Sequence, residues 1–196
     1  MCRWIAYSGT PIYLHEALFE PEHSLIDQSL RAKSSETTTN GDGFGIGWYN
    51  EREFPGVFKD VRPAWNDGNL QALSQQIRAS LFFAHVRAAT TGAVQRSNCH
   101  PFCHENWLFV HNGAIDDYEK IRRDLLFAVA PELFNSIEGT TDSELMFYLA
   151  LTFGMAGDVE SGLARMAGFV ESVGEKHGIE HPLQMTLGVS DGESLY

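Results

Sequence analysis

The sequence is poor in basic residues. It contains 14 Lys and Arg against 26 Asp and Glu, so its formal net charge is −12 at pH 7. A surface with this balance repels a phosphate backbone, and no cluster of Lys or Arg is dense enough to reverse the repulsion locally. We therefore expect that the protein does not bind nucleic acid.

Long apolar runs are also missing. Before Ser8 the amino terminus offers one basic residue, Arg3, and a short apolar run over residues 4–7. A signal peptide needs an apolar core of roughly 7–15 residues, and a membrane-spanning helix needs about 20. The sequence therefore predicts a cytoplasmic protein with no membrane partner.

Cysteine is scarce. Cys2, Cys99 and Cys103 are odd in number and do not resemble the disulfide framework of a secreted domain, so free thiols are expected. Residues 99–104 do hold four potential metal ligands. However, Pro101 disfavours the helix that would stack ligands four residues apart, and no second cluster accompanies them. The sequence predicts no metal site.

Internal repeats and low-complexity tracts are absent as well. A chain of 196 residues with 43% hydrophobic content fits one globular domain with a sizeable core, so we expect residues 1–196 to form a single domain. Residues 33–40 are the most linker-like stretch, but they are too short to separate two domains. A surface loop is expected there.

Short segments rich in aromatic and β-branched residues predict strands, and longer segments with apolar residues at helical spacing predict helices. The expected strands are residues 44–49, 55–59, 80–86, 107–111 and 184–189, and the expected helices are residues 24–31, 144–152 and 159–173. Strands in antiparallel-looking runs with helices grouped between them favour an α+β fold over an alternating βαβ fold.

Residues 41–47 carry glycine at every second position. No register of this segment satisfies the GxGxxG spacing of a dinucleotide site, and the segment leads into a strand rather than a helix. Close backbone packing is the expected reason for these glycines.

The position of Cys2 is informative. A small second residue favours removal of the initiator Met1, which would leave a thiol and a free amine on one residue. A thiol needs a base to become a nucleophile, and an α-amine with a pKa of about 7.7–8.0 can be that base. The alternative is a buried, apolar cysteine at the start of the first strand. Position alone leaves both interpretations open.

Three polar motifs follow. The strand over residues 80–86 delivers Arg87, whose planar guanidinium can hold a carboxylate or form a structural ion pair. Asn112 and Gly113 form either a tight turn, which the dipeptide alone favours, or an oxyanion hole. Asp142 precedes a helical pattern, within a capping-box spacing of Thr141 and Glu144, and can receive a substrate ammonium.

Together these motifs resemble the glutaminase domain of class II glutamine amidotransferases, from Met1 through Asp142. The resemblance implies Cys2 as the nucleophile, Arg87 and Thr90 as residues that hold the glutamine carboxylate, Asn112 and Gly113 as the oxyanion hole, and Asp142 as the residue that binds the α-amino group. Many members of the family have a His directly after the Thr that corresponds to Thr90. In this sequence Thr91 occupies that position, so contacts around the substrate carboxylate can differ.

Residues 1–3 and 40–49 are similar to a narrower branch of stand-alone amidotransferase-like hydrolases, which includes γ-glutamyl hydrolases of thiol metabolism. This resemblance implies the Ntn-hydrolase fold, a four-layer αββα sandwich of two antiparallel sheets. It also implies an N-terminal cysteine amidohydrolase that cleaves the γ-amide of glutamine or of a γ-glutamyl compound through a thioester, with no cofactor.

Two alternatives stay open. No synthase domain follows, so the chain is either a hydrolase or an ammonia-supplying glutaminase subunit whose partner holds the acceptor. It could also be a catalytically silent protein that binds γ-glutamyl ligands, in which Cys2 never becomes terminal.

The end of the sequence predicts an unfinished hairpin. Met185, Leu187 and Val189 alternate as in a half-buried strand, residues 191–192 are a hairpin signal, and the returning arm has only a few residues before Tyr196. We therefore expect the natural fold to continue through further strands, without which one strand edge would be bare.

Overall fold

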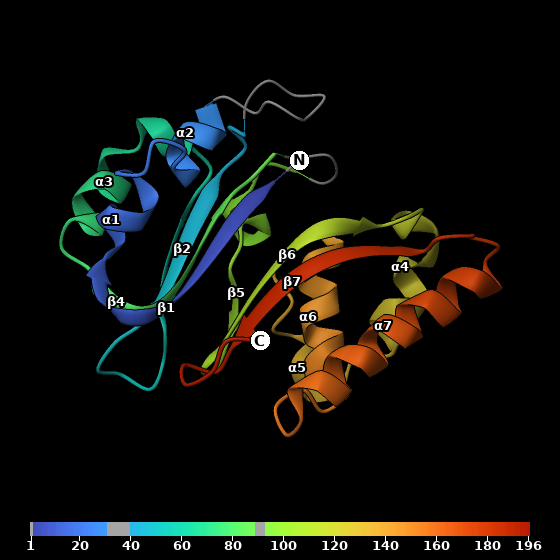
Figure 1. Cartoon of the computed structure of the whole chain (residues 1–196). Coiled ribbons are helices and arrows are strands. Elements are labelled where there is room, and N and C mark those ends of the chain that lie inside the picture. Colours follow the sequence, from blue (N-terminus) through green and yellow to red (C-terminus); the bar gives the residue numbers. More distant parts are fainter. Residues whose placement is uncertain (1, 31–39, 89–92) are drawn as a thin grey trace. The chain divides into compact units, whose positions relative to one another are not determined.

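The structure is a computed structural model that describes residues 2–30, 40–88 and 93–196. These residues form two compact units (Figure 1). Unit 1 consists of the described residues up to Val110 together with Leu187–Tyr196, and unit 2 consists of His111–Thr186. Unit 2 is therefore an uninterrupted segment that separates the two parts of unit 1 in the sequence.

A four-stranded antiparallel sheet is the centre of unit 1. Its strand order is β1–β4–β2–β3, with bounds Arg3–Tyr13 for β1, Phe44–Tyr49 for β2, Gly56–Asp60 for β3 and Arg78–Val86 for β4. Arg3 pairs with Val86 in this register. The register therefore brings the residue before β1 to the residues that follow β4.

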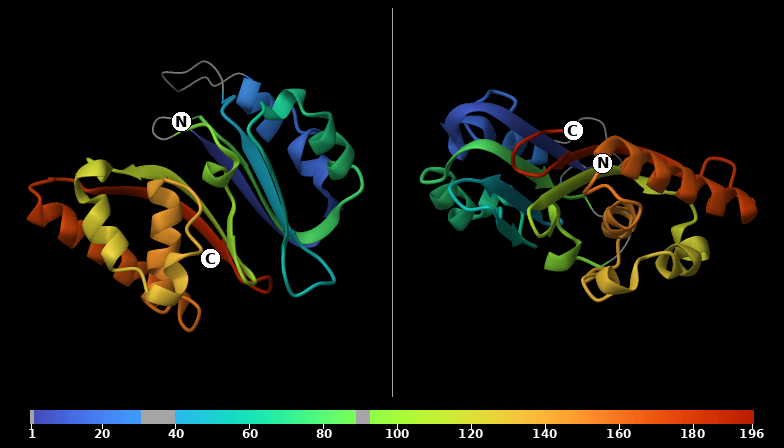
Figure 2. Two further views of the ribbon diagram at one scale, coloured as in Figure 1. Left: turned by 180° about the vertical axis from the view of Figure 1, so that it is seen from behind. Right: turned by 90° about the horizontal axis from the view of Figure 1, so that it is seen from below.

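Helices cover one face of this sheet, as Figure 2 shows. They are α1 (Leu14–Leu18), α2 (Leu25–Leu30), the short 3-10 helix Ala64–Asn66 and α3 (Gly68–Ser74). Because strand side chains alternate between faces, Phe44, Phe82 and Ala84 point toward the helices and pack with their leucines. This cluster is the larger apolar core of unit 1.

The opposite face of the same sheet packs against the part of a second sheet that belongs to unit 1. Leu81 and Phe83 of β4 form a buried cluster with Leu108 and Val110. The glycines of β2 make this approach possible, because a Cβ at Gly47 would collide with Leu108 and Pro101, and one at Gly45 with the carbonyl of His100. The predicted close backbone packing of residues 41–47 is confirmed.

The second sheet has the order β5–β6–β7, with bounds Phe102–His104, Trp107–Ile115 and Leu183–Ser190. The boundary between the units passes through β6 and β7. On the far side of β7, the backbone of Val189 exchanges hydrogen bonds with that of Tyr196. The expectation that further strands follow stays a prediction.

Four helices belong to unit 2: α4 (Tyr118–Phe127), α5 (Pro131–Phe134), α6 (Asp142–Thr152) and α7 (Val159–Lys176). Helix α6 is buried on nearly every side, because all eight residues from Ser143 to Ala150 are buried. Helix α7 is amphipathic, and Gly162 lets its backbone approach Met155 closely. Figure 1 shows these helices beside the unit 2 segments of β6 and β7.

The α+β class with two antiparallel sheets, predicted from the sequence, is confirmed. Residues 33–39 of the expected surface loop lie outside the described residues, and for Asn40 the expectation is wrong because its side chain is buried. Over the described ranges, no helix combines the length and apolar character that a membrane crossing needs. The single-domain expectation stays a prediction.

Candidate active site

Cys2 directly precedes β1 and is half-buried. Its Sγ lies 3.3 Å from both the backbone nitrogen and the carbonyl oxygen of Ala88. This contact follows from the sheet register, since Arg3 pairs with the last residue of β4 and Cys2 therefore faces the residues beyond it. Met1 lies outside the described residues.

Burial raises the pKa of the Cys2 thiol above its usual value. The Ala88 N–H, which donates to sulfur, and the positive charge of Arg87 act in the opposite direction, but they do not outweigh the loss of solvation. Burial thus favours the neutral thiol over the thiolate. A nucleophilic role for Cys2 requires a base that removes this proton.

Arg87 follows β4 immediately, and only 4% of its surface is exposed. Its backbone N–H donates to the carbonyl of Gly43 at 2.8 Å. Its Nη1 lies 3.5 Å from the carbonyl oxygen of Asp42 and 3.3 Å from that of Ala93. These two carbonyls accept from the guanidinium and orient it. Unit 1 thus brings the predicted nucleophile Cys2 and the predicted carboxylate ligand Arg87 together.

Asn112 and Gly113 lie inside β6, so the tight-turn interpretation of this dipeptide is wrong. Glycine is nevertheless required, because Gly113 has a φ of 153° and an added Cβ would collide with the carbonyl of Gln184. Strand alternation buries His111 and Ile115 on one face and directs Asn112 to the other. Thr90, the remaining predicted carboxylate contact, lies outside the described residues.

Asp142 is the first residue of α6 and is tied to β6. Its Oδ2 accepts a hydrogen bond from the backbone N–H of Ile115 at 2.9 Å, and its Oδ1 accepts from the N–H of Ser143 at 2.8 Å. Unit 2 thus brings Asp142 close to the strand that carries Asn112 and Gly113. An anionic carboxylate held rigidly in this way can receive an ammonium group.

The predicted capping box at this helix start is half confirmed. Thr141 is the N-cap, and its hydroxyl accepts from the N–H of Glu144 at 3.3 Å. The carboxylate of Glu144, however, accepts from the N–H groups of Glu138 and Gly139, at 3.0 and 2.7 Å. Glu144 therefore orders the loop before the helix, which keeps the Asp142 end of α6 fixed.

The sequence assigned no role to His111 and Ser143, which adjoin the predicted site residues Asn112 and Asp142 in the chain. His111 Nδ1 lies 2.8 Å from the hydroxyl of Ser143, and both side chains are buried. Each is a direct neighbour of a predicted site residue, which is the only signal that the sequence offers for them. Their contact joins the strand of Asn112 to the helix of Asp142.

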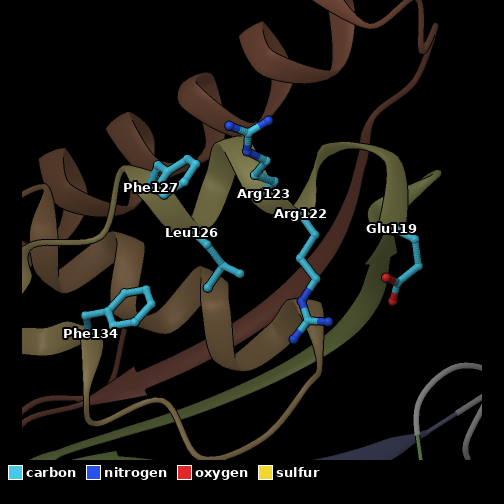
Figure 3. Close-up of a pocket in the computed structure, with 6 residues that line it drawn as sticks. All are labelled: Glu119, Arg122, Arg123, Leu126, Phe127 and Phe134. Carbon is cyan, nitrogen blue, oxygen red and sulfur yellow. The ribbon is translucent and has the colours of Figure 1, made fainter.

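A pocket of about 320 Å³ lies elsewhere in unit 2 (Figure 3). Helices α4 and α5 form it, and its lining includes the exposed Phe127 and Phe134. The Arg123 guanidinium stacks 5.2 Å from the ring centre of Phe127. This pocket holds none of the predicted site residues, so pocket size alone does not locate the predicted chemistry.

Potential metal ligands are dispersed in the part of the chain that the structure describes. No three or more His, Cys, Asp or Glu side chains there are grouped as a metal site would need. Cys99 Sγ contacts the carbonyls of Asp60 and Gln95, whereas Cys103 Sγ contacts that of Glu105. The two thiols of residues 99–104 thus have different surroundings.

Comparison with known proteins gives a consistent picture. The family model of "Glutamine amidotransferases class-II" matches residues 20–196. The chain is 41% identical over 160 residues to "Probable glutamine amidotransferase DUG3" of Saccharomyces cerevisiae, an alignment that covers 77% of this chain and 45% of the relative. It is 28% identical over 157 residues to "Gamma-glutamyl-hercynylcysteine sulfoxide hydrolase" of Mycolicibacterium smegmatis, covering 79% of this chain and 64% of the relative.

Solved structures share the fold. A glutamine aminotransferase class-II domain protein from Silicibacter pomeroyi superposes with a TM-score of 0.77 and 33% identity, covering 100% of this chain and 74% of that chain. Glutamine phosphoribosylpyrophosphate amidotransferase from B. subtilis gives a TM-score of 0.61 at 12% identity, covering 97% of this chain and 35% of that chain, a likeness of fold alone. The matches span about half to two thirds of the two curated relatives' lengths.

Proposed function

Because the chain belongs to the class II glutamine amidotransferases, we propose that it is an N-terminal cysteine amidohydrolase for the γ-amide of glutamine or of a γ-glutamyl compound. The observation that carries the proposal is the position of the Cys2 thiol, 3.3 Å from the backbone of Ala88, the residue that follows the buried cation Arg87. A thiol and a cation at one strand end suit attack on a substrate that carries a carboxylate.

The proposed reaction begins when Met1 is removed. The free amine of Cys2 takes the thiol proton, and sulfur attacks the γ-carbonyl carbon. The oxyanion of the tetrahedral intermediate accepts hydrogen bonds from the Asn112 amide and the Gly113 N–H. The C–N bond then breaks, the amine leaves with a proton from the Cys2 ammonium, and a γ-glutamyl thioester remains. Water attacks this thioester and releases glutamate and the thiol.

Two opposite charges define the substrate. Arg87 would bind the α-carboxylate and Asp142 the α-ammonium, so the substrate has a free amino-acid head group. An internal peptide residue has neither charge. This pairing favours glutamine and γ-glutamyl compounds over ordinary peptides, and it leaves the amine side of the scissile bond unrestricted.

Replacing Arg87 with alanine is expected to raise KM by about 10–100-fold, because one or two charged hydrogen bonds to the substrate carboxylate are lost. The effect on kcat should be smaller. Arg87→Lys should recover only part of the affinity, because an ammonium lacks the planar fork. The matched control is Arg78→Ala on the same strand, whose side chain donates to the Pro11 carbonyl at 3.2 Å. Unchanged KM with a lower melting temperature would instead assign Arg87 a structural role.

Experiments separate the proposed function from two other functions. An ammonia-supplying subunit would show low glutaminase turnover that rises when a synthase partner is added. A binding protein for γ-glutamyl ligands would bind glutamate analogues without releasing product. The predicted cytoplasmic location and the expectation that no cofactor is needed are compatible with all three functions.

The direct test compares the chain with and without a free Cys2 amine. Protein released at Cys2 from a cleavable amino-terminal tag should hydrolyse glutamine or γ-glutamyl-p-nitroanilide, and an electrophilic glutamine analogue should label Cys2, as intact mass would show. Protein shown by mass to retain Met1 should be inactive, because its terminal amine is displaced by one residue. Full activity in the Met1 form would contradict the assigned base. Absence of turnover and labelling in the released form would contradict the proposed function.

A further inference from the structure

His111 has a defined set of partners in unit 2. It lies on β6 with only 2% of its surface exposed. Its Nδ1 is 2.8 Å from the Ser143 hydroxyl, and its Nε2 is 3.4 Å from the Gln184 carbonyl oxygen on β7. The imidazole thus contacts the first turn of α6 on one side and the neighbouring strand on the other.

The acceptor at Gln184 fixes the tautomer. A carbonyl oxygen can only accept, so Nε2 must carry the proton, and the unprotonated Nδ1 must then accept the hydroxyl proton of Ser143. Burial lowers the pKa of His111 and favours the neutral ring, although the charge of Asp142 acts in the opposite direction. The geometry and the electrostatics agree on one neutral form.

Ser143 continues the connection to Asp142. Its N–H donates to Asp142 Oδ1 at 2.8 Å, and its hydroxyl lies 3.3 Å from the same oxygen. Since that hydroxyl has one proton and lies closer to His111, the imidazole is its main acceptor. Ile115 adds a second connection through its N–H to Asp142 Oδ2. Two residues of β6 that flank Asn112 and Gly113 are therefore both bonded to the start of α6.

We propose that His111, acting through Ser143, is a positioning residue that fixes the separation between the Asn112–Gly113 oxyanion site and Asp142. This inference rests on the proposed function. In a γ-glutamyl group, two methylenes separate the α-carbon, which bears the ammonium, from the carbonyl under attack, whereas a β-aspartyl group has one. A rigid separation selects the longer group, because a shorter one cannot reach both sites. The network therefore determines specificity for γ-glutamyl over β-aspartyl amides.

The test measures kcat/KM for γ-glutamyl-p-nitroanilide and β-aspartyl-p-nitroanilide. Ser143→Ala and His111→Gln both lose the hydrogen bond between His111 and Ser143. Each should reduce kcat/KM for the γ-glutamyl amide by about 10–100-fold, because the reacting group is misplaced. Both should also lower its ratio over the β-aspartyl amide by about 10-fold, since one methylene is discriminated by roughly 10–200-fold in a well-fitted site. His111→Asn, whose amide can still meet Ser143, should retain more of both.

The effects of Ser143→Ala and His111→Gln on kcat/KM should not be additive. If His111 acts through Ser143, the double variant should be about as impaired as either single variant, whereas independent contacts would multiply the losses. The matched control is His177→Asn in the same unit, which removes an exposed contact with Asp124 at 2.8 Å. This control should leave both rates and their ratio unchanged.

Histidine labelled with ¹⁵N gives a readout independent of activity: His111 should be neutral with its proton on Nε2, and Ser143→Ala should shift the Nδ1 resonance. A proton on Nδ1 would overturn the inference. So would active wild-type protein whose selectivity is unchanged in Ser143→Ala and His111→Gln. Wild-type protein that cleaves neither amide would instead overturn the proposed function, and the inference with it.

Discussion

Replacing Cys2 with alanine is expected to reduce γ-glutamyl hydrolysis by at least about 10⁴-fold, as in other enzymes that lose a covalent nucleophile. The reason is positional. The Cys2 Sγ lies against the Ala88 backbone, where β1 begins and β4 ends. The buried Cys99 is held by the carbonyls of Asp60 and Gln95 and cannot take over without backbone movement. Initial rates of glutamate release, with a melting curve for each protein, provide the measurement.

The control for this experiment is Cys103→Ala, because Cys103 is exposed and its sulfur contacts the Glu105 carbonyl. It should behave as wild type. Cys2→Ser preserves the shape of the side chain but not the acidity of the thiol, so it should be nearly as inactive as Cys2→Ala. Activity in Cys2→Ala within about 10-fold of wild type would exclude a thioester mechanism.

Replacing Asn112 with alanine is expected to lower kcat by about 10²–10³-fold with little change in KM, the usual effect of losing one oxyanion donor. The donor acts on charge that develops only in the transition state, so ground-state binding is barely affected. Asn112 is placed inside β6 with its side chain on the face opposite His111 and Ile115, so alanine can replace it without disturbing that buried face.

Asn106→Ala is the matched control for Asn112. The Asn106 side chain donates to the Asp191 carbonyl at 3.0 Å, which is a structural contact within unit 1. Its loss should lower the melting temperature and leave kcat unchanged. If Asn112→Ala shows the same pattern, with a circular dichroism melt that accounts for all the lost activity, then Asn112 is a structural residue and the oxyanion assignment fails.

The sequence predicted the elements whose pattern is regular. Strand β2 was expected over its observed bounds, because the segment is short and rich in aromatic and β-branched residues. Helix α6 was expected from residue 144 and begins two residues earlier, at Asp142. The long helix α7 extends three residues beyond its predicted end, to Lys176. Such segments carry their structure in local periodicity, so no knowledge of the rest of the chain is needed.

Other elements were missed because local signals oppose them. Strand β1 runs from Arg3 to Tyr13 although it contains Gly9 and Pro11, and its register shifts between Ser8 and Ile12 to accommodate them. Helix α4 buries Ile121 and Leu125 but also exposes Phe127, which blurs its apolar stripe. In both cases pairing or packing elsewhere in the chain decides the structure.

In the candidate site, too, some features could be predicted from the local sequence and others depend on distant contacts. Its residue types could be identified from the order of motifs, but the structural context of Asn112 and Gly113 could not. The dipeptide favours a turn locally, whereas here the unusual φ of Gly113 serves a close approach to Gln184, 71 residues later in the sequence. The bond between His111 and Ser143 spans 32 residues. Contacts of such length have no local signature in a single sequence.

Unit 2 separates the two parts of unit 1 in the sequence, so unit 1 can be completed only by contacts between distant segments. The Tyr49 hydroxyl donates to the Ser190 carbonyl across a separation of 141 residues, and Leu187–Tyr196 joins unit 1 only after unit 2 has been synthesised. Closing so long a loop costs entropy, and contacts of high sequence separation form slowly. Unit 2, however, holds residues 111–116 beside residues 182–184 through its own hydrogen bonds. Once unit 2 has folded, pairing of Leu187–Ser190 with the Trp107–Val110 part of β6 closes a loop of only a few residues, so unit 2 acts as a template for completing unit 1.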